Sequence, residues 1–370
     1  MIDRTTASAT VGRPPVVTPA GTHEGREWYE PIVESGLVPD AVLRAGIRRL
    51  LAQRLREEDR GDRTSNLART RALVDELRRS PIAIRTDAAN AQHYEVPAAF
   101  FEAVLGRHLK YSSGYWPDGV TTLDEAEAAM LDLTCRRARL ADGQTVLDLG
   151  CGWGSLSLYM AARYPASRIV GVSNSGSQRA FIEAQAAARG LTNLTVVTAD
   201  INDFTPDRRF DRVVSVEMFE HARNYARLLS RIAGWLGPDG LLFVHVFAHR
   251  RFAYPFEARD ASDWMARHFF TGGLMPSVDL FRWFQEDLRL AACWTLDGTH
   301  YEKTARAWLR NMDAHRAAIL SAFARTYGPD RARRWFARWR IFFLACAELF
   351  GYRRGEEWVV AHYLFDAARS

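Results

Sequence analysis

Three side chains that can bind a charge and move a proton stand close together in the sequence. Glu217, Glu220 and His221 lie within five residues of each other, where a strand is expected to end. Carboxylates can hold a cation, and an imidazole that titrates near neutral pH can take a proton from it. The sequence therefore predicts an acid–base site at this point of the chain.

A glycine-rich turn lies earlier, in the sequence TVLDLGCGWG of residues 145–154. Its apolar start is typical of a buried parallel strand, and Gly150, Gly152 and Gly154 let the chain turn sharply into a helix. Such a turn leaves bare backbone and free N–H groups for a ligand. We predict a cofactor site, although the spacing is not the G-x-G-x-x-G of dinucleotide-binding proteins and a purely structural turn is the alternative.

The segments around these motifs alternate between strands and helices. We expect strands at residues 145–149, 168–172, 194–198, 211–216 and 240–246, and helices at 155–163, 176–189 and 225–236. This alternation predicts βαβ units, and so an α/β fold with a doubly wound, Rossmann-like parallel sheet. The sheet would bring both motifs to the carboxyl ends of its strands, where ligands bind in such folds.

The whole chain divides into four expected parts. They are a flexible tail at 1–26, a helical extension with cofactor-covering loops at 27–121, the cofactor-binding core at 122–247, and a cap of helices and aromatic residues with a closing strand at 248–370. In the extension we expect helices from Pro39 to before Gly61 and at 65–79, and Thr122 with Glu125 predicts a capped helix start. In the last part we expect helices at 277–287, 303–326 and 330–349 and a strand at 358–365.

Composition narrows the class of protein. A hydrophobic content of 48% is ample for a large core. The net charge of +5 is concentrated at residues 41–80, with a second basic run at 325–340, but aromatic residues do not alternate with these arginines as in nucleic-acid platforms. Four dispersed cysteines indicate neither a metal site nor disulfides, and no signal peptide or membrane-spanning run is visible. We therefore expect a cytoplasmic protein that binds no nucleic acid and no metal.

The motifs together resemble a known family. Residues 148–154 are similar to the cofactor loop of class I S-adenosylmethionine-dependent methyltransferases. Residues 111–116 (YSSGYW), 218–221 (MFEH) and Tyr301 resemble the cyclopropane-fatty-acid synthase family in particular. Within it, the likeness is greatest to the coclaurine N-methyltransferase-like enzymes, which methylate benzylisoquinoline amines, and it runs from about Leu37 to Phe365.

The resemblance implies how S-adenosyl-L-methionine is held. The glycines approach its methionine part, and the tyrosine–serine loop closes over it. Most class I enzymes bind the ribose with a carboxylate, whereas this branch uses polar residues, and a later aspartate meets the adenine. The cofactor-binding residues expected on this basis are Tyr111, Ser112, Asp148, Gly150, Gly152, Gly154, Asn174, Gln178, Asp200 and Ile201.

The resemblance also implies an acceptor. An amine attacks a sulfonium methyl only when unprotonated, so His221 would be the base, assisted by Glu220, while Glu217 and Glu95 hold the ammonium form. The lipid-modifying synthases of the family usually have glycine where Glu217 stands. We therefore predict N-methylation of a small primary or secondary amine, aromatic or alicyclic. Further expected substrate-pocket residues are Tyr94, Ser113, His245, Phe269, Phe270 and Tyr301.

Two other functions stay open. The first is a cyclopropane-fatty-acyl-phospholipid synthase, docked on a membrane through residues 41–80 and acting on an unsaturated acyl chain. Such synthases bind bicarbonate with Cys, Glu, His and Tyr side chains; Glu220, His245 and Tyr301 match three of them, but Ser113 replaces the cysteine. The second is a silent cofactor-binding or scaffold protein, which the intact motifs disfavour. A homodimer is compatible with either enzyme.

Overall fold

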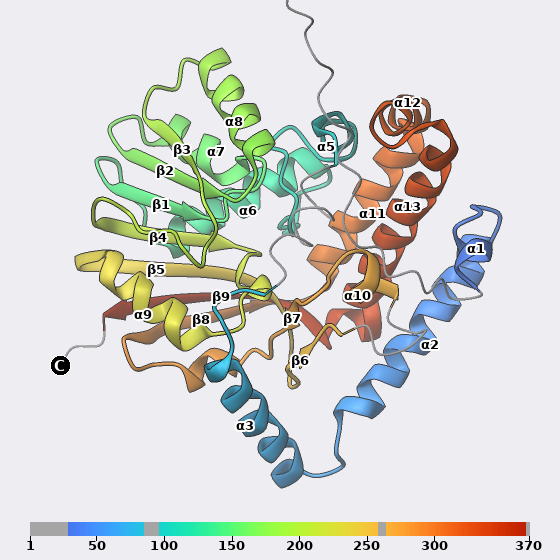
Figure 1. The fold of residues 1–370 in the computed structure, drawn as a ribbon, viewed down its shortest axis with the longest axis horizontal. Coiled ribbons are helices and arrows are strands. Elements are labelled where there is room, and N and C mark those ends of the chain that lie inside the picture. Colours follow the sequence, from blue (N-terminus) through green and yellow to red (C-terminus); the bar gives the residue numbers. More distant parts are fainter. Residues whose placement is uncertain (1–28, 85–95, 258–263, 368–370) are drawn as a thin grey trace, which may run out of the picture.

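A seven-stranded sheet forms the centre of the protein, for which a computed structural model describes residues 29–84, 96–257 and 264–367. The strand order is β3-β2-β1-β4-β5-β9-β8 (Figure 1). In chain order the strands are β1 (Thr145–Leu149), β2 (Arg168–Ser173), β3 (Leu194–Thr198), β4 (Phe210–Val216), β5 (Leu236–His249), β8 (Leu288–Leu296) and β9 (Trp358–Ala367). The first five are parallel, and β9 runs antiparallel between β5 and β8. The predicted α/β fold is therefore confirmed, with a mixed edge.

Four helices connect the parallel strands or lead into them. They are α6 (Leu123–Arg137), α7 (Ser155–Arg163), α8 (Gly176–Ala188) and α9 (Tyr225–Trp235). In α9 the residues Leu228, Leu229, Ile232 and Trp235 recur at helical spacing and are all buried, so one apolar face packs on the sheet. Thr122 caps α6 through a capping box with Glu125, as predicted.

A helical layer with an aromatic core stands beside one end of the sheet (Figure 1). Its helices are α5 (Ala98–Val104), α10 (Trp264–His268), α11 (Thr299–Ala314), α12 (Arg316–Tyr327) and α13 (Pro329–Gly351). Phe100, Trp308, Trp339 and Phe343 are fully buried in it and pack ring against ring. A small antiparallel pair of strands, β6 (Tyr254–Pro255) and β7 (Leu274–Met275), lies between this layer and the sheet.

The N-terminal extension contains α1 (Glu30–Val33) and two long helices, α2 (Asp40–Glu58) and α3 (Arg63–Arg79), which meet in a V (Figure 1). Both long helices were expected, within two residues at each end. Asp62 begins α3 by accepting a hydrogen bond from the Ser65 N–H. Across the described ranges, no helix is long and apolar enough to cross a membrane.

The predicted helix at 277–287 is wrong. The chain there makes only a 3-10 turn, Leu280–Trp283, and then enters β8. The apolar residues Leu280, Phe281 and Leu288 are indeed buried, but they pack on the sheet core from a turn and a strand. The start of the segment pairs with the end of β5, through a bridge between Ser277 and His249, and β8 begins at Leu288, so strand pairing at both ends outweighs the local helical pattern. The expected helix at 303–326 is likewise divided, into α11 and α12, at His315.

Candidate active site

Two adjoining cavities open where the parallel strands end. The larger one contains roughly 1330 Å³ of empty space, open solvent included, and reaches from the end of β1 to α11 and α13. The smaller one lies against the ends of β2 and β3. Gly150, Gly152, Gln178 and His221 line both. An extended ligand could therefore pass from one cavity to the other along the glycine turn.

The glycine turn is shaped to receive a ligand. Gly150, Gly152 and Gly154 all have left-handed φ angles, of 89°, 52° and 81°. A Cβ on Gly150 would come within 2.7 Å of Met218, and one on Gly154 within 2.6 Å of Ile182, whereas one on Gly152 would meet no atom within 4 Å. Gly150 and Gly154 are therefore packed against the protein, whereas Gly152 leaves bare backbone facing the cavities. This shape fits the predicted cofactor.

Asp148, at the end of β1, is fully buried and accepts a hydrogen bond of 2.6 Å from the Ser157 hydroxyl. Burial raises its pKa to about 6. It lines the larger cavity, below the glycine turn. Its position is compatible with the predicted cofactor-binding role.

The residues expected to hold the nucleoside lie together in the smaller cavity. Asn174, Gln178, Asp200 and Ile201 line it, although they follow two different strands in the chain, β2 and β3. Gln178 is oriented by the Ser173 hydroxyl, which donates to its Oε1 at 2.6 Å. Asp200 accepts hydrogen bonds at its Oδ1 from the Asn202 N–H and side-chain amide. The four residues that were predicted to bind the nucleoside thus line one cavity.

The tyrosine–serine loop, which contains Tyr111 and Ser112, lines the larger cavity together with the glycine turn. Tyr111 packs against Phe101 and Trp308, and Ser112 accepts a hydrogen bond from the Lys110 ammonium group. Lys110 is almost fully buried, and burial lowers its pKa to about 8 despite the attraction of Glu217 and Glu127.

Glu127 holds this loop in place from α6. It accepts hydrogen bonds from the backbone N–H groups of Gly106, His108 and Lys110. Burial raises the pKa of Glu127 to about 7. The loop that presents Lys110 and Ser112 to the cavity is thus anchored to a buried carboxyl group.

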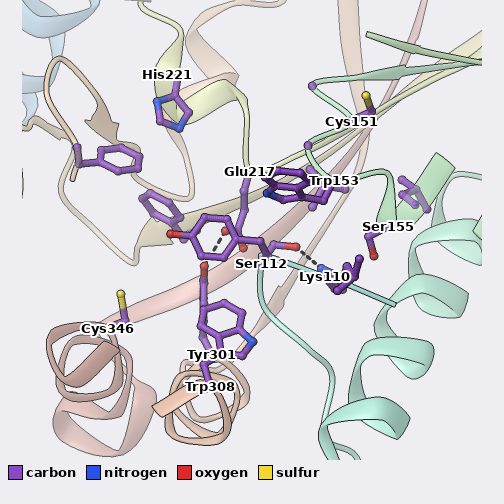
Figure 2. Close-up of a pocket in the computed structure, with 18 of the residues that line it drawn as sticks. Lys110, Ser112, Cys151, Trp153, Ser155, Glu217, His221, Tyr301, Trp308 and Cys346 are labelled. Atoms are coloured by element: carbon purple, nitrogen blue, oxygen red, sulfur yellow. Dashed lines mark hydrogen bonds between the residues drawn. The ribbon is translucent and has the colours of Figure 1, made fainter. Parts of the chain in front are cut away.

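Glu217 is the member of the acidic cluster at residues 217–221 whose carboxylate lines the larger cavity. It follows β4 with a left-handed φ of 49°, which turns its side chain into the larger cavity. Its Oε1 accepts a hydrogen bond of 3.0 Å from the Ser113 N–H, and its Oε2 accepts one of 2.7 Å from the Tyr301 hydroxyl (Figure 2). Burial raises the pKa of Glu217, and the charge of Lys110 opposes that rise.

The other two members of the acidic cluster are placed differently. His221 lines both cavities and stands apart from the Glu217–Tyr301 pair (Figure 2), and its ring centre lies 4.7 Å from that of Phe270 in a tilted contact. Glu220 is fully buried and lines neither cavity; its Oε1 accepts a hydrogen bond from the Phe247 N–H. Burial, followed by the charge of Glu217, raises the pKa of Glu220 well above its usual range.

The predicted pocket residues divide into two groups. Phe270 and Tyr301 line the larger cavity. His245 and Ser113 do not line it, but both contact Glu217, which does. Phe269 is fully buried in the aromatic core, against Trp339 and Phe342, and lines neither cavity. Tyr94 and Glu95 lie outside the described residues.

Sequence reasoning missed several groups at this site. Lys110 is one of only two lysines among 49 basic residues, and that rarity was the one available signal. His362 and Arg137 lie far from the motifs in sequence and approach Glu217 only through the pairing of β5 with β9 and the packing of α6. Cys346, from α13, also lines the cavity.

One further cluster has the geometry of a metal site. Ligand atoms of Glu30, Glu34 and His268 lie within 4.8 Å of one another. Arg338 forms two hydrogen bonds with Glu34, and Arg267 lies 3.3 Å from Glu30. Because arginines already balance both carboxylates, the cluster is an ion-pair network that ties α1 to α10 and α13.

Comparison with known proteins agrees with this geometry. Residues 83–358 match the family described as mycolic acid cyclopropane synthetase. The chain is 42% identical over 337 residues to (S)-coclaurine N-methyltransferase of Thalictrum flavum subsp. glaucum, covering 90% of this chain and 93% of that protein. It is 29% identical to the cyclopropane-fatty-acyl-phospholipid synthase of Escherichia coli strain K12, covering 86% and 76%.

A solved structure is similar over almost the whole fold. The crystal structure of coclaurine N-methyltransferase bound to N-methylheliamine and SAH matches with a TM-score of 0.88 and 40% identity, over 91% of this chain and 98% of that one. The glycine turn, the adjoining cavities and these matches lead to one conclusion. The chain belongs to the mycolic acid cyclopropane synthetase family and is an S-adenosylmethionine-dependent methyltransferase.

Proposed function

We propose that this enzyme methylates the nitrogen of a small primary or secondary amine, aromatic or alicyclic. The observation that carries the proposal is the buried carboxylate of Glu217 in a cavity lined mostly by aromatic and aliphatic side chains. Among the described residues, neither Glu217 nor Glu220 is paired with an arginine. Such a chamber attracts a compact organic cation that can replace solvent around the carboxylate.

Each group has a distinct task in this proposal. The bound cofactor supplies an electrophilic methyl group on sulfur. Glu217, fixed by Ser113 and Tyr301, holds the ammonium form of the acceptor. His221, which lines both cavities, takes the proton and frees the nitrogen lone pair. Aromatic walls such as Phe270 and Trp308 exclude water.

The two remaining predicted acids have different standing. Glu220 lies behind the cavity wall and does not touch the acceptor. It can assist methyl transfer only at a distance, through its electrostatic interaction with Glu217. Glu95 stays a predicted ligand of the ammonium group on the strength of the sequence resemblance alone.

Names of relatives support a nitrogen acceptor. Besides coclaurine N-methyltransferases from Thalictrum and Papaver somniferum, a pavine N-methyltransferase of Thalictrum flavum subsp. glaucum is 34% identical over 336 residues. N-methylheliamine, named as bound in the similar solved structure, is itself an N-methylated compound. These enzymes are named for different amines. The relatives therefore support an amine as the acceptor of this enzyme, but they do not identify which amine it is.

The lipid alternative is less well supported. Tyr301 donates its hydroxyl hydrogen to Glu217, and His245 faces the same carboxylate, so two groups that the resemblance assigned to bicarbonate are engaged by a side chain instead. The basic helices are also partly neutralised: Glu348 pairs with Arg44 and Arg48. That pairing weakens the case for a membrane-docking surface.

The proposed compartment is the cytoplasm. All four cysteines are free thiols, which is usual in a reducing environment.

The test is incubation with methyl-labelled cofactor. The enzyme is offered a panel of primary and secondary amines in one set of tubes and a phospholipid extract in another, and the labelled product is identified by mass spectrometry. We expect label on nitrogen of at least one amine. Label in acyl chains, with none in the amines, would replace the proposal with the synthase alternative.

A further inference from the structure

A row of polar side chains in close contact leads from a half-buried arginine to the carboxylate in the cavity. Arg137 of α6 donates from Nη1 to His362 Nδ1 at 2.8 Å. His362 Nε2 lies 3.0 Å from His245 Nδ1, and His245 Nε2 lies 3.3 Å from Glu217 Oε1. Both histidines are fully buried.

The sheet fixes the order of this row. His245 of β5 stands directly opposite His362 of β9, and His362 stands opposite Trp294 of β8. Residues paired in this way point to the same face of a sheet. Arg137 crosses that face, with its guanidinium 5.0 Å from the centre of the Trp294 ring. Three adjacent strands and one helix therefore hold the row.

The chemistry of arginine gives the row a direction. A guanidinium group only donates, so His362 Nδ1 must accept and its proton must be on Nε2. That proton is donated to His245 Nδ1, which leaves the proton of His245 on its own Nε2, facing Glu217. The opposite tautomer of His245 would place a lone pair against the carboxylate.

Burial, assisted by nearby cations, keeps both rings neutral, as the row requires. Burial, with the cations of Lys110 and Arg137 adding to it, lowers the pKa of His245 well below its usual value. Burial also lowers the pKa of His362, assisted by His245, Arg137 and Lys110. Glu217 is the acid that faces the row. A neutral imidazole offers one donor and one acceptor, which is what each position uses.

We propose that Arg137 and His362 are positioning residues that set the tautomer of His245, so that its Nε2–H faces Glu217 and holds it as an oriented, ionised carboxylate. This inference rests on the proposed function, in which Glu217 binds the ammonium group. The Nε2 atom of His245 has no fully formed hydrogen bond within the described ranges. It is thus free to tighten on Glu217 Oε1 when the acceptor binds, as catalytic hydrogen bonds often do.

Three variants separate this role from simple packing. His362→Phe keeps a ring but breaks the row, whereas His362→Gln can accept from Arg137 through its carbonyl and donate to His245 through its amide. Tyr363→Phe is the control, because it removes a buried hydroxyl hydrogen bond to the Val278 carbonyl from the neighbouring position of β9. Cofactor affinity is measured for each variant alongside amine kinetics.

For His362→Phe we expect the KM for the amine to rise about tenfold, the size of one lost hydrogen bond to a charged group, with unchanged cofactor affinity. The acidic limb of its kcat/KM profile should move to higher pH, because Glu217 loses support for its ionised form. His362→Gln should recover most of the loss. If His362→Phe behaves like Tyr363→Phe, or if Gln fails to rescue, the proposal is overturned.

A readout that needs no activity keeps the two proposals apart. Nitrogen-15 NMR of the wild-type enzyme labelled at histidine reports the tautomer of each ring, with His245 assigned by substitution. We expect neutral rings protonated at Nε2 for both His245 and His362. Protonation of His245 at Nδ1 overturns the row even if amines are methylated, whereas the expected tautomers without amine turnover would leave the row intact and count against the proposed function.

Discussion

The Tyr301 hydroxyl donates a hydrogen bond of 2.7 Å to Glu217 Oε2, joining α11 to the end of β4 across the cavity. The two residues are 84 positions apart in sequence. The ring of Tyr301 is held by a stack on Phe350 of α13, with centroids 4.2 Å apart. The helical layer therefore does more than cover the cavity, because it fixes the carboxylate that we assign to the acceptor.

Removing that hydroxyl should weaken amine binding. In Tyr301→Phe the stack on Phe350 is kept, but Glu217 loses a donor to its ionised form, so its pKa rises. We expect kcat/KM for the amine to fall about tenfold near neutral pH, with recovery as the pH increases. Steady-state kinetics across pH measure this. A uniform loss at every pH would assign Tyr301 to packing alone.

The substitution Gly152→Ala tests whether the glycine turn binds the cofactor. An alanine there has room for its methyl group in the structure but takes a left-handed φ, which costs about 1 kcal/mol of folding free energy. That methyl group would stand where the bound cofactor is expected, so affinity for S-adenosylmethionine should fall by about tenfold or more.

Gly119→Ala provides the matched control for that variant. Gly119 also has a left-handed φ, of 86°, and also has no atom within 4 Å of an added Cβ, but it is exposed and lines neither cavity. Calorimetry should therefore show equal losses of stability and unequal losses of cofactor affinity. Equal affinities in the two variants would place the cofactor elsewhere.

Lys110 should make stability depend on pH. Its folded pKa of about 8 is below the usual value of 10.5, so the unfolded chain binds the proton more tightly between these values and stability rises with pH there. Relative to Lys110→Met, the wild-type enzyme should gain about 3 kcal/mol of unfolding free energy between pH 7 and pH 11. Urea unfolding at both pH values measures the difference. If the difference in unfolding free energy between wild type and Lys110→Met does not change with pH, the pKa of Lys110 is not lowered in the folded protein.

Much of the core could be predicted from sequence, because its signals are local. The turn at Gly150 and the cap at Thr122 depend on residues a few positions apart, and the structure has both elements at the expected places. The partners of Glu217 could not be predicted in the same way. Tyr301 was expected in the pocket only by resemblance, and His362 reaches the site through strand pairing.

The errors have the same origin. Residues 277–287 were expected to form a helix, yet they make only a 3-10 turn before the chain pairs with β9 as β8. Glu220 comes only three residues after Glu217 in the sequence, but a 3-10 turn over Phe219–His221 places it behind the cavity wall. Backbone geometry over single residues, such as the left-handed φ of Glu217, decided which acid faces the cavity.

A small anion should replace the side chain of Glu217. Glycine suits the left-handed backbone at this position, so Glu217→Gly should fold and leave a space beside the Ser113 N–H and the Tyr301 hydroxyl. Added formate can accept both hydrogen bonds, and we expect it to restore part of the lost amine turnover. Rescue should be absent in Glu217→Gln, which fills the space.

The most direct test of the account is the comparison of amine turnover with cofactor affinity in Glu217→Gly. Loss of the buried charge that holds the ammonium group should lower kcat/KM for the amine about a hundredfold, while the dissociation constant of S-adenosylmethionine stays within about threefold of wild type. Equal losses of both quantities, or undiminished amine turnover, would contradict the assignment of Glu217 as the cation-binding group.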